Sequence, residues 1–162
     1  MLMKKFWNIF DNVIYMFTTV VYSLLVLVCF VNVVARHVFN HPFVWSDELS
    51  LYLLVWLVFF SAALCLHKGE HVYVEALRDH IGGLLRLIWD LVVDVLIVVF
   101  MAIHSYYAYV LCQTARIDIS ATLGVSRTWV YVGVLIGSLL CVIFGIRVII
   151  QRICKYCTER RN

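Results

Sequence analysis

The stretch Arg36–Ser50, RHVFNHPFVWSDELS, separates the first two long apolar segments of this 162-residue chain. It begins with an arginine and contains the only proline of the chain, a tryptophan and two adjacent acids. The segment before it, Val13–Ala35, and the segment that starts at its end, Leu49–Leu66, contain no Asp, Glu, Lys or Arg. The stretch therefore has the character of a corner between two apolar helices.

Uncharged apolar blocks make up half of the chain, which is 64% hydrophobic with a mean hydropathy of +0.96. Soluble domains are about 45–50% apolar, so the excess is too large for a core folded in water. A helix needs about 20 residues to cross about 30 Å of hydrocarbon. The four blocks hold 18 to 23 residues each and are Val13–Ala35, Leu49–Leu66, Val95–Ala115 and Thr128–Ile146.

The sequence thus predicts an all-α integral membrane protein with four transmembrane helices in a single membrane domain, residues 1–162. The first apolar run is too long for a cleavable signal peptide and lacks a small-residue cleavage pattern, so we expect it to be retained as a span. The helices are expected at about 13–35, 45–66, 84–115 and 128–150, with a loop at 67–83 and a basic tail at 151–162.

Lysine and arginine are unevenly distributed among the predicted loops and ends. Ten of the 13 lie at the two ends or in the second loop, and only Arg36, Arg116 and Arg127 lie in the first and third loops. The positive-inside rule therefore places both termini, the loop 67–83 and the tail 151–162 in the cytoplasm. The net charge of +3 requires no nucleic-acid partner, because these residues lie where the rule expects them, beside anionic lipid.

Arg36 lies on the side that the positive-inside rule disfavours, so we expect it to have an acidic partner. Asp47 and Glu48 follow at the start of the second helix, where acids also suit the helix dipole. A pair between Arg36 and either acid would close the corner. The alternative is that all three charges are solvated, since exposed pairs contribute little. Trp45 is expected at headgroup depth.

Helix 4 carries small residues at four-residue steps, a pattern that lets another helix approach closely. The four positions are Gly133, Gly137, Cys141 and Gly145.

The third helix carries two acids four residues apart near its cytoplasmic end, Asp90 and Asp94. Arg86 lies four residues before Asp90 and is its candidate partner. Asp94 has no basic partner on its own helix, so we expect it to pair with an arginine or lysine of another subunit.

No familiar catalytic or nucleotide-binding motif occurs, so we expect neither enzyme activity nor a bound metal or cofactor. Cys154 and Cys157 form a lone C-x-x-C, which is weak evidence for zinc or redox chemistry. Two alternatives remain open, a haem-bearing membrane anchor and a small stand-alone exporter. Haem needs histidines on facing helices at similar depth, and only His104 lies clearly within a span. An exporter needs a charged site near the midplane, and neither Glu48 nor Asp94 is clearly central.

Several strings between residues 32 and 77 carry a family resemblance. They are Asn32-Val-Val-Ala-Arg-His-Val-Phe, Pro42-Phe-Val-Trp-Ser-Asp-Glu-Leu, Leu53-Leu-Val-Trp-Leu-Val-Phe and His67-Lys-Gly-Glu-His-Val-Tyr-Val-Glu-Ala-Leu. This region resembles the small membrane subunit of TRAP (tripartite ATP-independent periplasmic) transporters, the DctQ type. The family often has a proline in helix 4, where this chain has Val132-Gly-Val-Leu.

The resemblance implies a non-catalytic subunit of the bacterial inner membrane that scaffolds a large multi-span subunit. The large subunit would hold the substrate and sodium sites, and a periplasmic binding protein would deliver an organic acid such as a dicarboxylate or sialic acid. By position, structural or subunit-contact roles fall to Arg36, Trp45, Glu48, Trp56 and His71. None of these residues is expected to bind the substrate.

Overall fold

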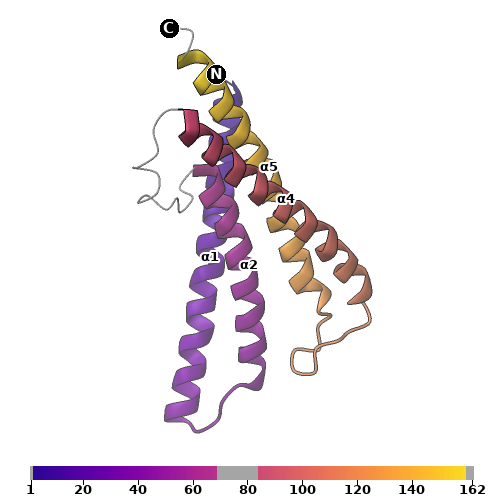
Figure 1. Cartoon of the computed structure of the whole chain (residues 1–162). Coiled ribbons are helices and arrows are strands. Elements are labelled where there is room, and N and C mark those ends of the chain that lie inside the picture. The colour runs from indigo at the N-terminus through magenta and orange to yellow at the C-terminus, as the bar shows by residue number, and fades with distance from the viewer. Residues whose placement is uncertain (1, 69–83, 160–162) are drawn as a thin grey trace.

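The computed structural model describes residues 2–68 and 84–159, although within these ranges the side chains of residues 2–9, 68, 84, 86, 155, 157 and 159 lie outside the description. This part of the chain consists of helices, a turn between the first two of them and a short loop between the last two (Figure 1). The helices are α1 (Leu2–Val38), α2 (Val44–Lys68), α4 (Leu84–Thr114) and α5 (Thr128–Glu159).

All four helices are long and apolar enough to cross a membrane, which confirms the predicted fold class. The spans are Phe10–Val38, Val44–His67, Leu87–Thr114 and Thr128–Cys154. Two helices are longer than predicted, since α1 already begins at Leu2 and α5 continues through most of the predicted tail. The uncharged blocks mark only the hydrocarbon-crossing part. No glycine or proline ends these two helices where the charged residues begin.

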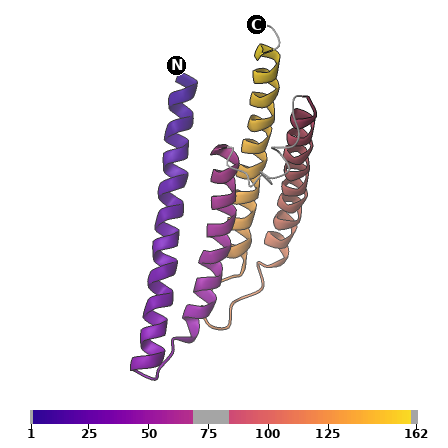
Figure 2. The ribbon, with the colours of Figure 1, turned by 60° about the vertical axis from the view of Figure 1, so that its left-hand side comes forward.

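The helices stand in a row in the order α1, α2, α5, α4, and they do not form a closed bundle (Figures 1 and 2). α1 packs on α2, α2 on α5, and α5 on α4. α5 is the most buried of the spans, with 44% of its most apolar window buried, compared with 11–17% for the other spans. The first residues of α1 and the last residues of α5 lie on the same side of the molecule, at the upper ends of the helices in Figure 1.

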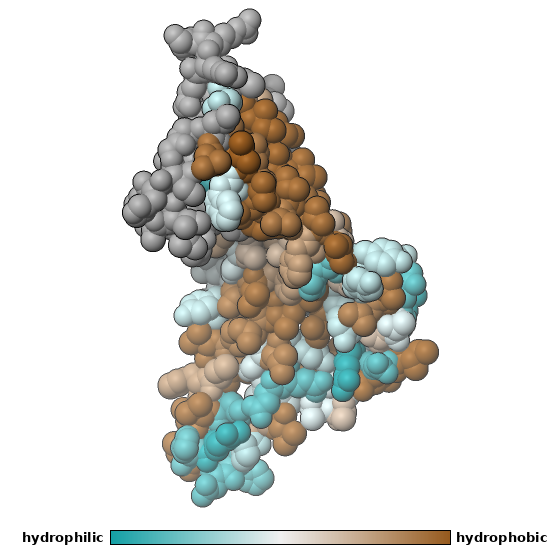
Figure 3. All heavy atoms as spheres, viewed as in Figure 1, coloured by the Kyte–Doolittle hydropathy of each residue, from teal (hydrophilic) through white to brown (hydrophobic). Residues whose placement is uncertain are grey.

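The core lies where α1, α2 and α5 meet, and aromatic rings fill much of it. Phe17 packs on Phe60 with ring centres 4.8 Å apart, and Phe10 meets Phe144 edge-on at 6.0 Å. Most of the remaining apolar surface points outward. Figure 3 shows this surface along the helices, with polar side chains gathered at the corner between α1 and α2 and at the loop after α4.

Candidate functional site

The corner between α1 and α2 is held by an asparagine. The Asn32 side-chain amide donates to Asp47 Oδ1 at 3.0 Å, and its carbonyl oxygen accepts from the Phe43 backbone N–H at 3.2 Å. Arg36 is more loosely placed, with NH2 3.9 Å from Asp47 Oδ2 and both side chains mostly exposed. Of the two acids expected to face Arg36, Asp47 is therefore the neighbour. Asn40, at φ 50°, makes the tight turn of the corner.

Glu48 points away from Arg36 and toward the loop between α4 and α5. The Tyr52 hydroxyl donates to Oε1 at 2.8 Å, and the Ser120 hydroxyl donates to Oε2 at 2.5 Å. The Thr122 hydroxyl also donates to Oε2. Three hydroxyl donors thus satisfy one carboxylate, and two of them come from more than 70 residues further along the chain.

The loop between α4 and α5 is folded so that it presents these hydroxyls to Glu48. Ser120 N–H donates to the Val125 carbonyl at 2.9 Å, and Gly124 N–H donates to the Ser120 carbonyl at 3.1 Å. Gly124 has φ +65°, a left-handed conformation that glycine adopts without steric cost. Glu48 therefore ties this loop, and with it the start of α5, to the start of α2.

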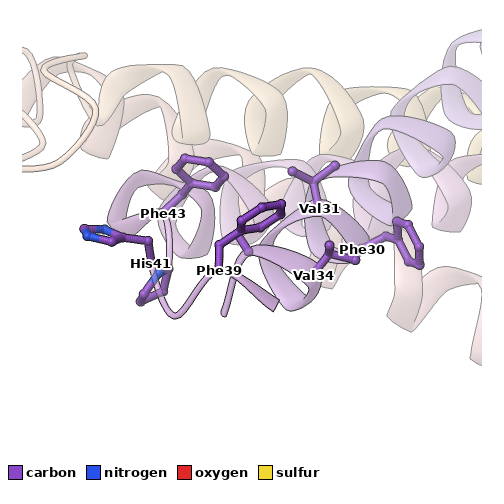
Figure 4. Close-up of a pocket in the computed structure, with 8 residues that line it drawn as sticks. Phe30, Val31, Val34, Phe39, His41 and Phe43 are labelled. Atoms are coloured by element: carbon purple, nitrogen blue, oxygen red, sulfur yellow. The ribbon is translucent and has the colours of Figure 1, made fainter. Parts of the chain in front are cut away.

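An apolar groove of about 490 Å³ lies on the outer side of the corner. Figure 4 shows that its lining comes from the end of α1 and from the turn, including Phe30, Phe39, His41 and Phe43. Trp45 stacks on Phe43 with ring centres 5.6 Å apart and is 40% exposed. The corner thus presents aromatic surface outward.

The small-residue face of α5 is filled from within the chain. Trp56 covers Gly133 and donates its indole N–H to the Trp129 carbonyl at 3.1 Å. A Cβ added at Gly137 would lie 2.5 Å from Phe59 Cβ, and Cys141 Sγ lies 3.9 Å from the Phe59 carbonyl oxygen.

Gly145, the last member of the same face, meets α4, where an added Cβ would lie 2.5 Å from Val98 Cγ2. The pattern therefore serves the close packing of α5 against its two neighbours in the row.

Asp94 has its basic partner in its own chain, so the expectation of a partner from another subunit is wrong. Arg152 Nε lies 2.9 Å from Asp94 Oδ2, and Arg152 NH1 lies 2.5 Å from Asp90 Oδ2. All three side chains are largely buried. The sequence reading assigned Arg152 to a surface tail, whereas the continuous α5 carries it back against α4. The side chain of Arg86, the expected partner of Asp90, lies outside the described residues.

A second polar cluster, which sequence reasoning missed, joins α1, α2 and α5. His67 Nε2 lies 2.6 Å from Asp11 Oδ2, and Arg147 NH1 lies 3.1 Å from His67 Nδ1. A guanidinium can only donate, so Nδ1 accepts, and we assign the ring proton to Nε2, which donates to Asp11. Asp11, His67 and Arg147 each lie just outside an uncharged block, far apart in the sequence. No local sequence pattern therefore predicts that they are in contact.

The polar side chains described above form hydrogen bonds and ion pairs mainly with one another. Within the described residues, no group of three or more His, Cys, Asp and Glu side chains is placed to hold a metal. His71 lies outside the described residues, as does the side chain of Cys157, so the lone C-x-x-C is only partly described. These polar contacts therefore connect helices to one another.

Comparison with known proteins identifies the family. Residues 25–155 match the family described as "Tripartite ATP-independent periplasmic transporters, DctQ component". The chain is 25% identical over 100 residues to the sialic acid TRAP transporter permease protein SiaT of Haemophilus influenzae, covering 62% of this chain and 16% of that one.

Two shorter relatives agree. A putative TRAP transporter small permease protein of Haemophilus influenzae is 30% identical over 77 residues, 48% of each chain. The sialic acid TRAP transporter small permease protein SiaQ of Vibrio cholerae is 22% identical over 140 residues, 86% of this chain and 81% of that one. The matched stretch thus spans less than half the length of the first two relatives. The family match covers most of the chain, which therefore belongs to the DctQ family of small membrane subunits of TRAP transporters.

Proposed function

We propose that this chain is a non-catalytic scaffold for a large multi-span permease subunit. The observation that carries the proposal is the match to SiaT, in which the similar stretch is only 16% of a much longer permease chain. The internal geometry supports it, because the polar side chains described above serve contacts between helices. A rigid row of helices suits a part that stays still while its partner moves.

The residues singled out from the sequence that the structure describes divide into two groups under this proposal. Internal packing engages Glu48, Trp56, Asp94 and the small-residue face of α5. Contact with the large subunit falls to the exposed side chains of the corner, which are Arg36, Trp45 and Asp47.

The topology that we propose has both termini in the cytoplasm. Ten of 13 lysines and arginines lie on that side under this arrangement. The corner at Arg36 and the loop after α4 then face the periplasm of a bacterial inner membrane. This orientation sets the aromatic groove of the corner on the side from which a periplasmic binding protein approaches.

The transport cycle that we propose is sodium-coupled uptake of an organic acid delivered by that binding protein. The names of SiaT and SiaQ specify sialic acid, which is a carboxylic acid. The family description specifies periplasmic transporters. The small subunit contributes no substrate or sodium ligand in this scheme.

Co-purification with the large permease subunit of the same transporter tests the scaffold. The tagged small subunit is expected to retain the large subunit in mild detergent, and Trp45→Ala is expected to weaken this retention. Sialic acid uptake into proteoliposomes is expected to require both subunits, the binding protein and an inward sodium gradient. Uptake by the small subunit alone would instead support the exporter, and a Soret band in its visible spectrum would support the haem anchor.

A further inference from the structure

A valley runs along α5, between α2 and α4 on one broad face of the row. It has a volume of about 520 Å³ and is almost entirely apolar. Tyr131 and Val134 of α5 lie at its floor, Phe59 lines it from α2, and His104 and Tyr107 line it from α4. Because α2 and α4 each pack on α5, the valley lies between two ridges formed by whole helices.

His104 is the one histidine among the side chains that line this valley, and the lining contains no lysine, arginine or acid. It lies about 15 Å along the helix axis from Thr114, the nearer end of the span, and so well inside the hydrocarbon. Its ring packs against Phe59 and Phe100 with centres 5.1 and 6.1 Å apart. Its Nδ1 is buried and has no hydrogen-bond partner among the described residues, so Nε2 is the ring nitrogen that a group outside the chain can reach. A polar group without a partner is costly in an apolar environment.

A second groove, on the opposite broad face, provides a comparison. It is of similar volume, about 480 Å³, and lies between α1 and α2. Leu57 lines it, two residues and about 200° round the helix from Phe59. Its Thr18 and Thr19 hydroxyls each donate to a carbonyl of their own helix at 2.8 Å. These threonines are satisfied in lipid, whereas His104 is not.

We propose that the valley over α5 receives a transmembrane helix of the large permease subunit, and that this helix presents a hydrogen-bonding side chain to Nε2 of His104. The inference rests on the proposed function. A lipid acyl chain fills apolar space but has no hydrogen-bonding atom at this depth, whereas a serine, asparagine or carboxyl side chain on a helix does. The length of SiaT outside the matched stretch supplies a partner of sufficient size.

Site-specific photocrosslinking tests this proposal in the co-expressed pair of subunits. Tyr107 lines the valley and is 61% exposed, so p-benzoylphenylalanine can replace it without entering the core. Tyr109 is the matched control, because it is 52% exposed but points about 200° away round the same helix. The probe at position 107 is expected to crosslink to the large subunit, and the probe at position 109 is expected to react with lipid.

The role of His104 is tested in the position-107 probe background. His104→Leu is expected to lower the crosslink yield about threefold or more, in line with one membrane hydrogen bond. His104→Gln, which keeps a donor and an acceptor, is expected to retain most of the yield. Equal yields from the two variants would overturn the role of His104.

The outcomes separate the two proposals. If the large subunit co-purifies but the position-107 probe reacts only with lipid or with a second copy of this chain, the valley proposal fails and the scaffold stands. Stronger crosslinking from position 109 than from position 107 has the same meaning. If the large subunit does not co-purify at all, both proposals fail.

Discussion

Replacing Gly137 with alanine should force α2 and α5 apart. The new Cβ would lie 2.5 Å from Phe59 Cβ and 3.2 Å from its carbonyl carbon. Carbon atoms pack at about 3.5–4.0 Å, so the helices have to separate by about 1 Å or more. Both atoms are fixed to the backbone of α2, and rotation of a side chain cannot move them.

The expected loss in the free energy of unfolding is up to about 2 kcal/mol, from an overpacking cost of about 1–3 kcal/mol less the helix preference of alanine over glycine, about 1 kcal/mol. Gly145→Ala is the matched control. Its Cβ would come equally close, 2.5 Å, but to Cγ2 of Val98, the end of a side chain that can turn. Turning a side chain off its rotamer costs about 0.5–1.5 kcal/mol, which the gain in helix preference offsets.

Unfolding of the purified chain from mild detergent by increasing sodium dodecyl sulfate measures this difference, with tryptophan fluorescence as the signal. Gly137→Ala is expected to unfold at a lower mole fraction of the denaturing detergent, and Gly145→Ala close to the original chain. Equal losses in the two variants would refute the reasoning. They would show that the atoms met by the new methyl group do not decide the cost.

Three other changes give contrasting results. Arg152→Leu is expected to lower the free energy of unfolding by about 3–5 kcal/mol in the same titration, because it removes the guanidinium that lies 2.9 Å from the buried Asp94 carboxylate. Adding Asp94→Asn should restore part of this loss, and a further loss would contradict the pairing. Glu48→Ala should release the loop after α4, so that trypsin cuts faster after Arg127; an unchanged rate would contradict the tie. Asp47→Ala should leave that rate as it is and lower the free energy of unfolding by about 0.5–1.5 kcal/mol, because it removes the hydrogen bond from Asn32 and an exposed pair with Arg36 that contributes little.

The spans were predictable because the thickness of the hydrocarbon fixes the length of an uncharged helix. The corner was also predictable in outline, since the acids beside Arg36 were close enough in sequence to reach it. The partner of Glu48 was not. Ser120 and Thr122 belong to a loop more than 70 residues away, and their approach depends on how α2 and α5 pack.

The buried ionic contacts were missed for a different reason. Uncharged blocks guide the predicted bounds, so the first helix is expected to begin at about residue 13, just after Asp11, and the last to end at about residue 150, just before Arg152. Arg152 therefore belongs to the predicted surface tail, residues 151–162, and the prediction gives Asp94 a partner from another subunit. The absence of glycine and proline from residues 147–159 is the signal that would have extended the last helix and brought Arg152 into consideration.

The order of the row also has a consequence for biogenesis. α4 leaves the ribosome before α5, yet α5 is its main packing partner among the described helices. The third span therefore has to wait in the bilayer until the last one is synthesised, and that last helix must enter between two helices that are already inserted. A nascent chain interrupted before residue 128 holds Asp90 and Asp94 in the membrane without Arg152. The insertion of α5 is therefore the step that brings a guanidinium to these two carboxyl groups.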